Sequence, residues 1–246
     1  MSHNLVEIQE GALIISDAHF SYNRPELFFL IEEIYLGKKE IPQLILMGDI
    51  FDNLFGGIPY TYKANQTLID MFNAIALKID VIYLEGNHDF QLQKVFQNMT
   101  IIPIEKQPVQ CKYKEKKVLL AHGDFDGALG YKIYTYLIRN PFVLFILRLI
   151  DSLTGHSILN FVDRHLEKKD DCNEFTDFEK FVQNRIGNNY NFDYFIEGHY
   201  HQNKSYQWNN SNYINLAAFA CNQRYFIVKS IKDNELLEEK SFSKGM

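Results

Sequence analysis

The sequence predicts an α/β fold in which short buried strands alternate with helices. Five apolar runs are each bounded by Gly, Asp, Asn or His, which favours strands over helices; they cover residues 12–16, 44–47, 81–84, 118–121 and 194–197. Helical patterns at 25–36 and 67–78 separate the first three runs, and Pro25 is well placed to open the first helix. This alternation predicts a sheet with helices packed on it.

The end of the chain follows a different pattern. Residues 204–208, 213–216 and 224–230 each favour a strand, and short polar turns join them without a helix. We expect an antiparallel extension or a second sheet there. The length of 246 residues suits a single domain over 1–246.

Composition excludes several classes of protein. Apolar residues make up 46% of the chain, as in a globular enzyme and unlike a disordered chain. The net charge of −6 argues against general nucleic-acid binding, so we expect no nucleic-acid partner. Small anionic substrates stay compatible with this charge, because a bound metal inverts the local potential. The sequence identifies no protein partner.

The compartment is predicted from the cysteines and the N-terminus. Cys111, Cys172 and Cys221 are odd in number and widely scattered, which indicates reduced thiols in a cytosolic protein. The first residues lack a basic start followed by an apolar core, so no secretory signal is expected. The apolar run at 141–150 is shorter than the about 20 residues that span a bilayer. The cytoplasm is the expected location.

Polar motifs follow all five predicted strands directly. Loops beyond the carboxyl ends of strands form the ligand sites of α/β sheets, so we expect these motifs to meet at one edge of the sheet. Any one of them alone is more often a turn or a satisfied polar residue, but five in order are improbable as coincidence. The motifs are Asp17-Ala-His19, Gly48-Asp49-Ile-Phe-Asp52, Gly86-Asn87-His88-Asp89, His122-Gly123-Asp124 and Gly198-His199-Tyr-His201.

The side chains in these motifs are suited to binding metal ions. Asp17 and His19 are two residues apart, as are His199 and His201, and in extended backbone this spacing puts both members of a pair on the same face. The donors are carboxylates, an amide oxygen and imidazoles, without a thiolate. Such a set suits Mn²⁺, Zn²⁺ or Fe instead of a structural thiolate zinc site.

The ordered set DxH, GDxxD, GNHD, HGD and GHxH resembles the calcineurin-like metallophosphoesterase superfamily from Asp17 to His201. The resemblance implies a four-layer α/β/β/α sandwich and two divalent metal ions, Mn²⁺ first, with Zn²⁺ or Fe as alternatives. Such a pair of ions clamps a phosphate and activates the attacking water. Asp49 is the residue expected to bridge both ions. The implied ligands are Asp17, His19, Asp49 and His201 for metal one, and Asp49, Asn87, His122 and His199 for metal two.

The same resemblance implies a catalytic group of Asn87, His88 and Asp89. His88 would face the phosphate, where its imidazolium stabilises charge or protonates the leaving oxygen. Asp89 and Asp52 would orient neighbouring side chains, although carboxylates that only form turns explain them about as well.

Residues of about 127–170, the insertion, separate the HGD motif from the GHxH motif. From residue 131 to 169 they hold six Lys or Arg against three acidic residues, together with many aromatic and apolar side chains. A helical lid over a greasy, anionic substrate has this composition, and so does an ordinary helical pair that covers the sheet. If the run at 141–150 is helical, its apolar side chains wrap around the helix and cannot all pack on one sheet.

The insertion, motif order and length resemble the UDP-2,3-diacylglucosamine diphosphatases of lipid A biosynthesis. That resemblance implies cleavage of a lipid-linked UDP-sugar at the α-phosphorus to UMP and 2,3-diacylglucosamine 1-phosphate, lipid X. It also implies a peripheral position on the inner face of the inner membrane, with Arg139 and Arg148 suited to anionic headgroups. The expected substrate contacts are Asn87, His88, Tyr131, Arg139, Arg164 and Lys168.

Two alternatives stay open at this point. The best-known branch of those enzymes has Arg where this chain has His88, so another phosphoesterase acting on nucleotides, nucleoside polyphosphates or phosphoproteins is the first alternative. The second is a non-catalytic module that keeps the fold without its metals. That module predicts missing ligands, whereas all seven expected positions are filled.

Overall fold

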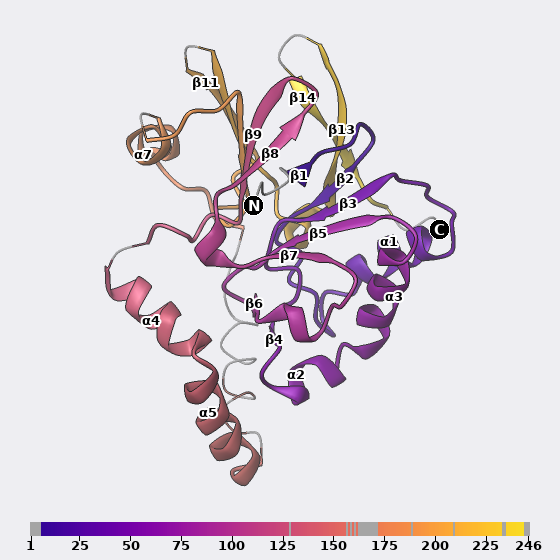
Figure 1. Cartoon of the computed structure of the whole chain (residues 1–246), viewed down its shortest axis with the longest axis vertical. Helices are drawn as coiled ribbons and strands as arrows, with labels where there is room; N and C mark the ends of the chain where they lie inside the picture. The colour runs from indigo at the N-terminus through magenta and orange to yellow at the C-terminus, as the bar shows by residue number, and fades with distance from the viewer. Residues whose placement is uncertain are drawn as a thin grey trace, which may run out of the picture.

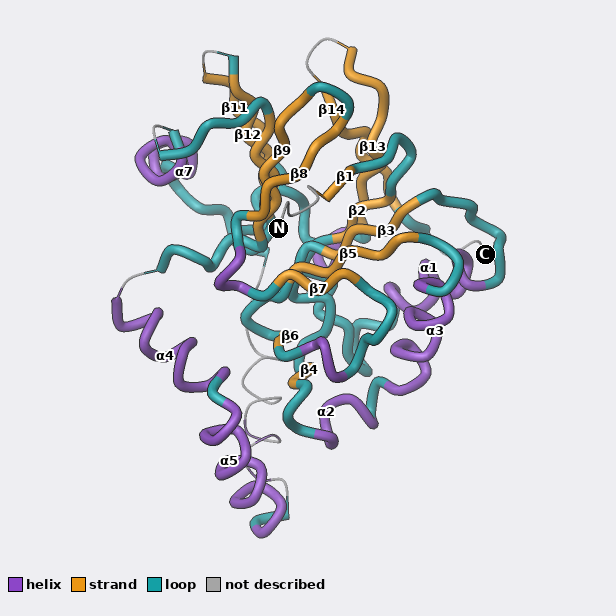
Figure 2. Tube along the Cα trace, viewed as in Figure 1, coloured by secondary structure: helices purple, strands orange, loops and turns teal. Residues whose placement is uncertain are grey.

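The computed structural model describes residues 6–127, 129–155, 157, 159, 161, 172–187, 189–208, 210–232 and 235–243. Its framework is a pair of six-stranded sheets (Figures 1 and 2). The first sheet has the order β14 (Glu235–Ser241), β13 (Arg224–Lys232), β2 (Leu13–Ile15), β3 (Gln43–Leu46), β5 (Asp80–Leu84) and β7 (Thr100–Ile102). The second has the order β1 (Val6–Glu7), β8 (Val109–Tyr113), β9 (Lys116–Ala121), β10 (Tyr194–Glu197), β12 (Ser211–Asn215) and β11 (Lys204–Trp208).

The two sheets pack face to face, and helices cover their outer faces. Side chains alternate along each strand, so Ile14 of β2 joins Ile196 of β10 in the core between the sheets, while Leu13 points outward. Helices α1 (Glu26–Tyr35) and α3 (Gln66–Ala76) pack on the outward face of the first sheet. Helix α7 (Phe178–Ile186) packs on the second. These layers confirm the α/β/β/α sandwich.

The continuous apolar runs are explained by this burial on both faces. All residues of β2, β3 and β10 are buried, as expected when a strand is covered on both sides. The five predicted strands and both predicted helices are confirmed, with bounds that differ by at most two residues at either end. The expectation of one sheet edge is corrected, because β2, β3 and β5 belong to one sheet and β9 and β10 to the other.

The tail is confirmed as strands, with one correction. Strand β11 pairs antiparallel with β12, and β13 pairs antiparallel with β2 and β14. A short helix, α8 (Phe219–Asn222), interrupts this region between β12 and β13, where we expected no helix. Four residues are too few to show helical periodicity in a sequence, which is why α8 escapes prediction.

Helices α4 (Leu129–Arg139) and α5 (Pro141–Leu153) lie in the insertion and extend away from both sheets (Figure 1). Asn140 caps α5 by accepting hydrogen bonds from the backbone N–H groups of Phe142 and Val143, at 2.9 and 3.3 Å. Pro141 opens the helix, as its fixed φ favours. Within the described ranges, helices fall short of the length and apolarity needed to cross a bilayer.

Small elements link the insertion to the sandwich. Strands β4 (Leu54–Phe55) and β6 (Asp89–Phe90) form a two-stranded parallel pair, and α2 (Pro59–Lys63) follows β4. A satellite apolar cluster covers this pair and contains Ile58, Phe90, Leu144 and Leu159, with Phe55 and Ile138 packed against it. Leu144 belongs to α5, so this cluster is where α5 contacts the body of the protein.

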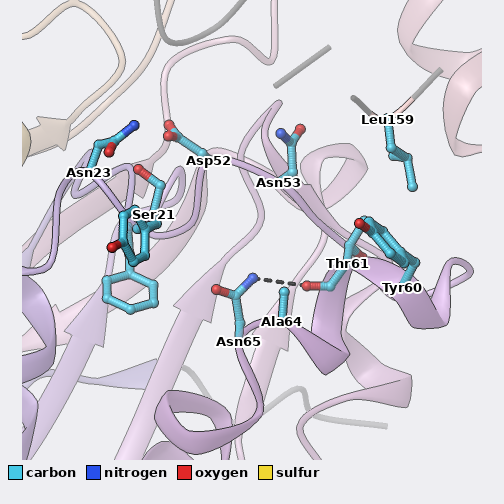
Figure 3. Close-up of a pocket in the computed structure, with 11 residues that line it drawn as sticks. Ser21, Asn23, Asp52, Asn53, Tyr60, Thr61, Ala64, Asn65 and Leu159 are labelled. Carbon is cyan, nitrogen blue, oxygen red and sulfur yellow. Dashed lines mark hydrogen bonds between the residues drawn. The ribbon is translucent and has the colours of Figure 1, made fainter. Parts of the chain in front are cut away.

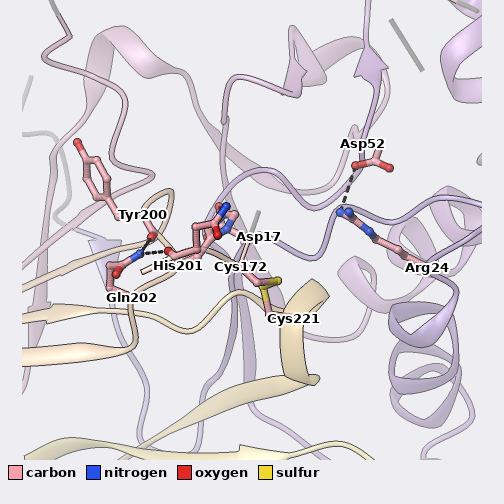
Figure 4. Close-up of a disulfide and its surroundings, with 9 residues drawn as sticks. Asp17, Arg24, Asp52, Cys172, Tyr200, His201, Gln202 and Cys221 are labelled. Carbon is pink, nitrogen blue, oxygen red and sulfur yellow. Dashed lines mark hydrogen bonds and ion pairs between the residues drawn. A yellow bond between two sulfur atoms is a disulfide. The ribbon is translucent and has the colours of Figure 1, made fainter. Parts of the chain in front are cut away.

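The expectation of three reduced thiols is wrong for two of the cysteines. Cys172 and Cys221 form a disulfide (Figure 4). Cys111 is free and buried. The two bonded residues are 49 positions apart, and only the fold brings the segment after the insertion against α8. Sequence spacing therefore gives no sign of the pairing.

Candidate metal centre

The five polar motifs lie together, at the carboxyl ends of strands from both sheets. Strands β2, β3 and β5 run parallel, so the loops that follow them leave the same edge of the first sheet. Strands β9 and β10 are also parallel and bring two loops from the second sheet. The backbone N–H of His199 donates to both carboxylate oxygens of Asp17, at 3.1 and 3.0 Å, and so joins the two sets of loops directly.

A first cluster of donors consists of Asp17, His19 and His201. Their ligating atoms lie within 4.8 Å of one another, and His201 Nε2 is 3.0 Å from Asp17 Oδ1. Asp17 and His19 are almost completely buried. Burial raises the pKa of Asp17, but the charge and hydrogen bond of His201 outweigh it and hold that pKa below its usual value. The carboxylate is therefore ionised, as a metal ligand must be.

A second cluster consists of Asp49, His122 and His199. His122 Nε2 lies 3.3 Å from Asp49 Oδ2 and 3.4 Å from Asn87 Oδ1. His122 Nδ1 is 3.0 Å from the carbonyl oxygen of Met47, which accepts its proton and aims the Nε2 atom at Asp49. Burial, followed by the charge of His122, lowers the pKa of His199 to about 4. His199 is thus neutral at pH 7, which is the form that binds metals.

The backbone is strained at five of these side chains. Positive φ angles of 43–61° occur at Asp17, His19, Asp49, His199 and His201. A left-handed conformation is uncommon for residues other than glycine, and such strain concentrates at functional sites because the surrounding fold holds it in place. The same conformation recurs in three separate loops. This recurrence indicates that the loops are shaped to aim these side chains and not to form relaxed turns.

Two glycines allow the loops to approach closely. A Cβ atom on Gly86 would lie 2.2 Å from Asp49 Oδ1 and 2.6 Å from the Asp49 nitrogen. On Gly198, it would lie 2.4 Å from Asp17 Oδ2. Any larger residue at either position would displace a carboxylate of the centre.

Asp89 holds the loop that carries Asp49. Its carboxylate accepts hydrogen bonds from the backbone N–H of Asp49 at 3.0 Å, of Ile50 at 2.6 Å and of Gly86 at 2.9 Å. The hydroxyl of Tyr83 donates to it at 2.6 Å. Burial and the charge of Asp49 raise the pKa of Asp89 to about 7. These bonds fix the backbone of the Asp49 loop to Asp89, and the role of Asp89 in orienting metal ligands stays a prediction.

The donor set fits a pair of divalent ions. Carboxylates, imidazoles and one amide oxygen are the ligands that Mn²⁺, Zn²⁺ and Fe accept. His19 is 1% exposed, and its Nε2 atom lacks a hydrogen-bond partner in the part of the chain that the structure describes. Buried polar atoms are nearly always paired, so an orphaned imidazole nitrogen beside two carboxylates indicates a place for a cation. The assignment of individual ligands to each ion stays a prediction.

His88 and Asp52 form a third group with His19. The ligating atoms of these three residues lie within 4.8 Å of one another. His88 Nδ1 is 2.9 Å from the carbonyl oxygen of Asp52, and the backbone N–H of His88 donates to Asp49 Oδ1 at 2.8 Å. Asp52 Oδ1 lies 3.3 Å from His19 Nδ1 and 3.9 Å from Arg24 Nη1. His88 therefore borders both donor clusters, with its Nδ1 atom already occupied.

A pocket of about 230 Å³ opens beside Asp52 (Figure 3). Helix α2 and the segment after it supply one wall, with Tyr60, Thr61 and Asn65. Leu159 reaches the pocket from the insertion. The pocket thus lies between Asp52 and Leu159 of the insertion.

The structure describes the side chain of only one of the four expected substrate contacts in the insertion, Arg139. Arg139 is only 9% exposed, and its guanidinium points into the protein and donates to the carbonyl oxygen of Gly86. The same guanidinium forms an ion pair with Glu85, with Nη1 3.4 Å from Glu85 Oε2. A contact of Arg139 with substrate or anionic headgroups stays a prediction. Tyr131 belongs to α4, but its side chain lies outside the described residues, as do Arg164 and Lys168 altogether. Contacts of these three stay predictions.

Sequence reasoning missed a buried ionic network behind the second cluster. Arg185 of α7 donates to Asp126 at 2.7 and 2.8 Å, and to Glu197 at 2.7 and 2.9 Å. It also donates to the carbonyl oxygen of Gly123 at 2.9 Å, next to His122. The one available signal was Glu197, an acidic residue that ends an apolar strand. A buried carboxylate requires a cation partner, but its partner could not be named from spacing.

Comparisons with known proteins agree with this geometry. The family model described as calcineurin-like phosphoesterase matches residues 12–203. The UDP-2,3-diacylglucosamine hydrolase of Pseudomonas fluorescens (strain Pf0-1) is 26% identical over 199 residues, covering 77% of this chain and 79% of that protein. The protein of the same name from Pseudomonas syringae pv. tomato is 24% identical over 198 residues, covering 77% and 79%.

Solved structures that are similar to this chain include a novel archaeal phosphodiesterase. It shares 14% identity with a TM-score of 0.47, and the match covers 94% of this chain and 99% of that one. The phosphoesterase YfcE of Escherichia coli matches with the same identity, coverage and TM-score. The family model covers well over half of the sequence, from the strand before Asp17 to just beyond His201. The chain therefore belongs to the calcineurin-like phosphoesterase family.

Proposed function

We propose that this hydrolase cleaves the pyrophosphate of UDP-2,3-diacylglucosamine, releasing UMP and 2,3-diacylglucosamine 1-phosphate. One observation carries the proposal: a centre suited to phosphate esters lies beside helices that expose apolar side chains. Phe142 and Phe145 of α5 are 70% and 60% exposed. A substrate with both a pyrophosphate and acyl chains matches both features. Curated relatives with the name UDP-2,3-diacylglucosamine hydrolase support the same assignment.

The metal ions of this centre are proposed to be Mn²⁺, with Zn²⁺ or Fe as alternatives. Metal one would be held by Asp17, His19, Asp49 and His201, and metal two by Asp49, Asn87, His122 and His199. When bound, a pair of divalent ions supplies Lewis-acid stabilisation of the phosphoryl oxygens and lowers the pKa of water. Oxygen and nitrogen donors without thiolate suit Mn²⁺, and metal analysis of the purified protein decides among the three.

The side chains perform the positioning and the proton transfer. In the reaction, an oxygen of water forms a bond to the α-phosphorus, and the bond from that phosphorus to the bridging oxygen breaks. Asn87 and the backbone around Gly86 place the phosphate, while Asp89 fixes the loop of Asp49 from behind. The preset geometry removes the entropy of assembling these groups during the reaction.

His88 is proposed as the acid that meets the leaving phosphate. Because Nδ1 is 2.9 Å from the carbonyl oxygen of Asp52, Nε2 is the ring nitrogen left for the substrate. Its imidazolium form stabilises negative charge on the phosphate or donates a proton to the departing oxygen. The backbone N–H of His88 donates to Asp49 Oδ1, and this bond keeps the His88 ring close to the donor clusters.

The insertion is proposed to collect the substrate from the inner face of the inner membrane, with the enzyme cytoplasmic and peripherally bound. Exposed apolar side chains run along α5, and Arg148 on the same helix is exposed. Burying apolar side chains in lipid while a nearby cation meets headgroups is the physics of an interfacial helix. Residues 127–170 would then act as a lid on a single domain.

The assay compares UDP-2,3-diacylglucosamine with soluble substrates in ¹⁸O-labelled water. We expect metal-dependent release of UMP, with the label in UMP because water attacks the α-phosphorus. Chelation should stop the reaction, and Mn²⁺ should restore it. Hydrolysis of soluble nucleotides without turnover of the diacylated substrate would favour the alternative, a phosphoesterase for nucleotides, which the His88 in place of Arg keeps open.

A further inference from the structure

Arg139, at the end of α4, reaches from the insertion to the turn that carries Asn87 and His88. Its Nη2 atom donates a hydrogen bond to the carbonyl oxygen of Gly86 at 2.7 Å, directly before Asn87. Its Nη1 atom lies 3.4 Å from Glu85 Oε2. The guanidinium also sits over the ring of Phe90, 5.0 Å from its centroid. These contacts surround the Asn87–His88 turn on both sides.

The main chain of Arg139 makes a second attachment to the same turn. Gln91 Nε2 donates to the carbonyl oxygen of Arg139 at 2.6 Å. Glu85 is itself fixed, because its Oε1 accepts the backbone N–H of Leu92 at 2.9 Å. Both ends of the segment from Glu85 to Gln91 are therefore tied to one residue of α4. The guanidinium bonds are buried and the Gln91 bond is partly buried, so a shift of α4 would break these bonds or move the turn with it.

The junction with α5 extends this connection to the apolar helix. Asn140 follows Arg139 and caps α5, and Leu144 one turn later is 4% exposed in the cluster with Phe90. Phe90 is thus shared: α5 packs on it through Leu144, and Arg139 covers it. The docked part of α5 and the catalytic turn rest on the same side chain.

We propose that Arg139 is a positioning residue that couples the docking of α4 and α5 to the geometry of the Asn87–His88 turn. The Gly86 carbonyl takes its working orientation when the guanidinium is in place, and this orients the Asn87 amide oxygen and the His88 ring. The proposal rests on the proposed function only in taking the insertion as the substrate-facing part. Its core statement concerns the metal centre and can be tested without the lipid.

The test compares Arg139→Ala, Arg139→Lys and Leu144→Ala with the wild type. Arg224→Ala is the matched control, because Arg224 is an arginine of β13 paired with Glu239 on the surface. Each protein is assayed for Mn²⁺ affinity, for kcat and KM on bis(p-nitrophenyl) phosphate, and for thermal unfolding. Removing a group that orients a metal ligand typically costs about 10–100-fold in metal affinity or activity, and we expect Arg139→Ala in this range on kcat and Mn²⁺ affinity.

Three further outcomes sharpen the test. Arg139→Lys should lose several-fold, since a point-charge ammonium cannot serve Glu85 and Gly86 together as the guanidinium fork does. Leu144→Ala, which loosens α5 without touching the turn, should lower kcat on the soluble ester in the same direction. Millimolar guanidinium should partly restore Arg139→Ala and leave Arg224→Ala unchanged. If Arg139 only stabilised the fold, its variants would lower the unfolding temperature without these effects on kcat.

Wild-type Mn²⁺ affinity and kcat in folded Arg139→Ala would overturn the proposal. So would a loss confined to KM for the diacylated substrate, which would make Arg139 a substrate contact. If Arg139→Ala does not fold, unchanged kcat and metal affinity in Arg139→Lys overturn it equally. Failure of the proposed function gives a different result, because the wild type would then hydrolyse the soluble ester but not UDP-2,3-diacylglucosamine. The effects of the Arg139 variants on the soluble ester would still test the positioning role.

Discussion

The metal centre buries charged groups, whereas the insertion exposes apolar groups, and both arrangements lower the stability of the folded chain. In the centre, Asp17, Asp49 and His122 are 0–2% exposed, so charged groups are taken out of water. In the insertion, Phe142 and Leu153 are 70% and 79% exposed, so large apolar groups are left in water. Each arrangement is unfavourable for the isolated chain. Each becomes favourable once a binding partner of the opposite character is present.

The comparison teaches which partner each region requires. Clustered carboxylates and an orphaned imidazole nitrogen of His19 are stabilised by cations. Exposed phenylalanines on one helix are stabilised by acyl chains or lipid, at about 1.5–3 kcal/mol for each ring that becomes fully buried. Strained backbone in the first region and exposed apolar side chains in the second follow the same logic, because stability is given up where binding restores it.

The largest effect is expected from Asp49, the residue asked to bridge both ions. Asp49→Ala should abolish hydrolysis of every substrate and lower the metal content, since the other donors are left facing each other without the shared carboxylate. Asp52→Ala is the matched control and should be milder, because the Asp52 carboxylate contacts His19 at 3.3 Å but is not expected to bridge the two ions. Metal analysis and turnover of both variants check this. Two tightly held ions in folded Asp49→Ala would refute the bridging role.

The next largest effect is expected from substitution of His88, which tests whether the centre needs an acid in addition to metals. His88→Ala should retain its ions but lose rate by about 10²–10⁴-fold, the usual contribution of a general acid. His88→Arg restores the residue of the best-known related branch and should retain more activity. The check is kcat together with metal content for all three proteins. Equal kcat of wild type and His88→Ala would remove His88 from the mechanism.

Much of the centre was predictable because its donors follow strands directly. A buried strand reads as a short apolar run, and the loop after it is where ligand sites form, so residues such as Asp17 and His199 could be named from order alone. The division into two sheets could not be predicted in this way. Parallel strands β2 and β9 have the same sequence character, and which strands pair depends on contacts far apart in the chain.

The insertion was predictable in composition but not in orientation. A basic and apolar helical pair was expected, yet the sequence does not indicate that Arg139 turns inward to Glu85 while Arg148 stays exposed. Both are arginines among apolar neighbours. The difference depends on the carboxylate of Glu85, which lies 54 residues earlier, directly after β5. Long-range charge pairing of this kind leaves no local pattern.

A smaller and selective effect is expected on the exposed side of α5. Replacing Phe142 and Phe145 together by Ser should lower kcat/KM for the diacylated substrate by about ten- to a hundredfold, which corresponds to about 1.4–2.8 kcal/mol if the two rings become only partly buried against the acyl chains. Hydrolysis of bis(p-nitrophenyl) phosphate should stay unchanged, because the donors are untouched. Leu144→Ser is the contrast on the same helix, since Leu144 is buried and its loss should reduce stability. Parallel losses on both substrates would make Phe142 and Phe145 structural.

The smallest effect on turnover is expected from the bond that joins the two regions covalently. The disulfide connects Cys172, after the insertion, to Cys221 in α8, and Ala220 of α8 donates a hydrogen bond to the carbonyl oxygen of Asp17 at 3.1 Å. Other contacts hold the same segment: Gln202 Nε2 donates to the carbonyl oxygen of Asn173 at 3.0 Å, and Gln202 Oε1 accepts the backbone N–H of Phe175 at 2.8 Å.

Because these contacts remain after reduction, kcat at 25 °C should stay within about a factor of two. A tenfold change in kcat would need a change of about 1.4 kcal/mol in the activation free energy. The unfolding free energy should fall by at most about 4 kcal/mol, the loop-closure entropy of a cross-link over roughly 50 residues. Thermal unfolding and turnover, each measured with and without dithiothreitol, check both numbers. The double variant Cys172→Ser with Cys221→Ser is the control and should not respond to the reductant. Loss of metal on reduction would instead mean that the disulfide holds the Asp17 loop in place, and that the insertion and the centre are joined through α8 as well as through Arg139.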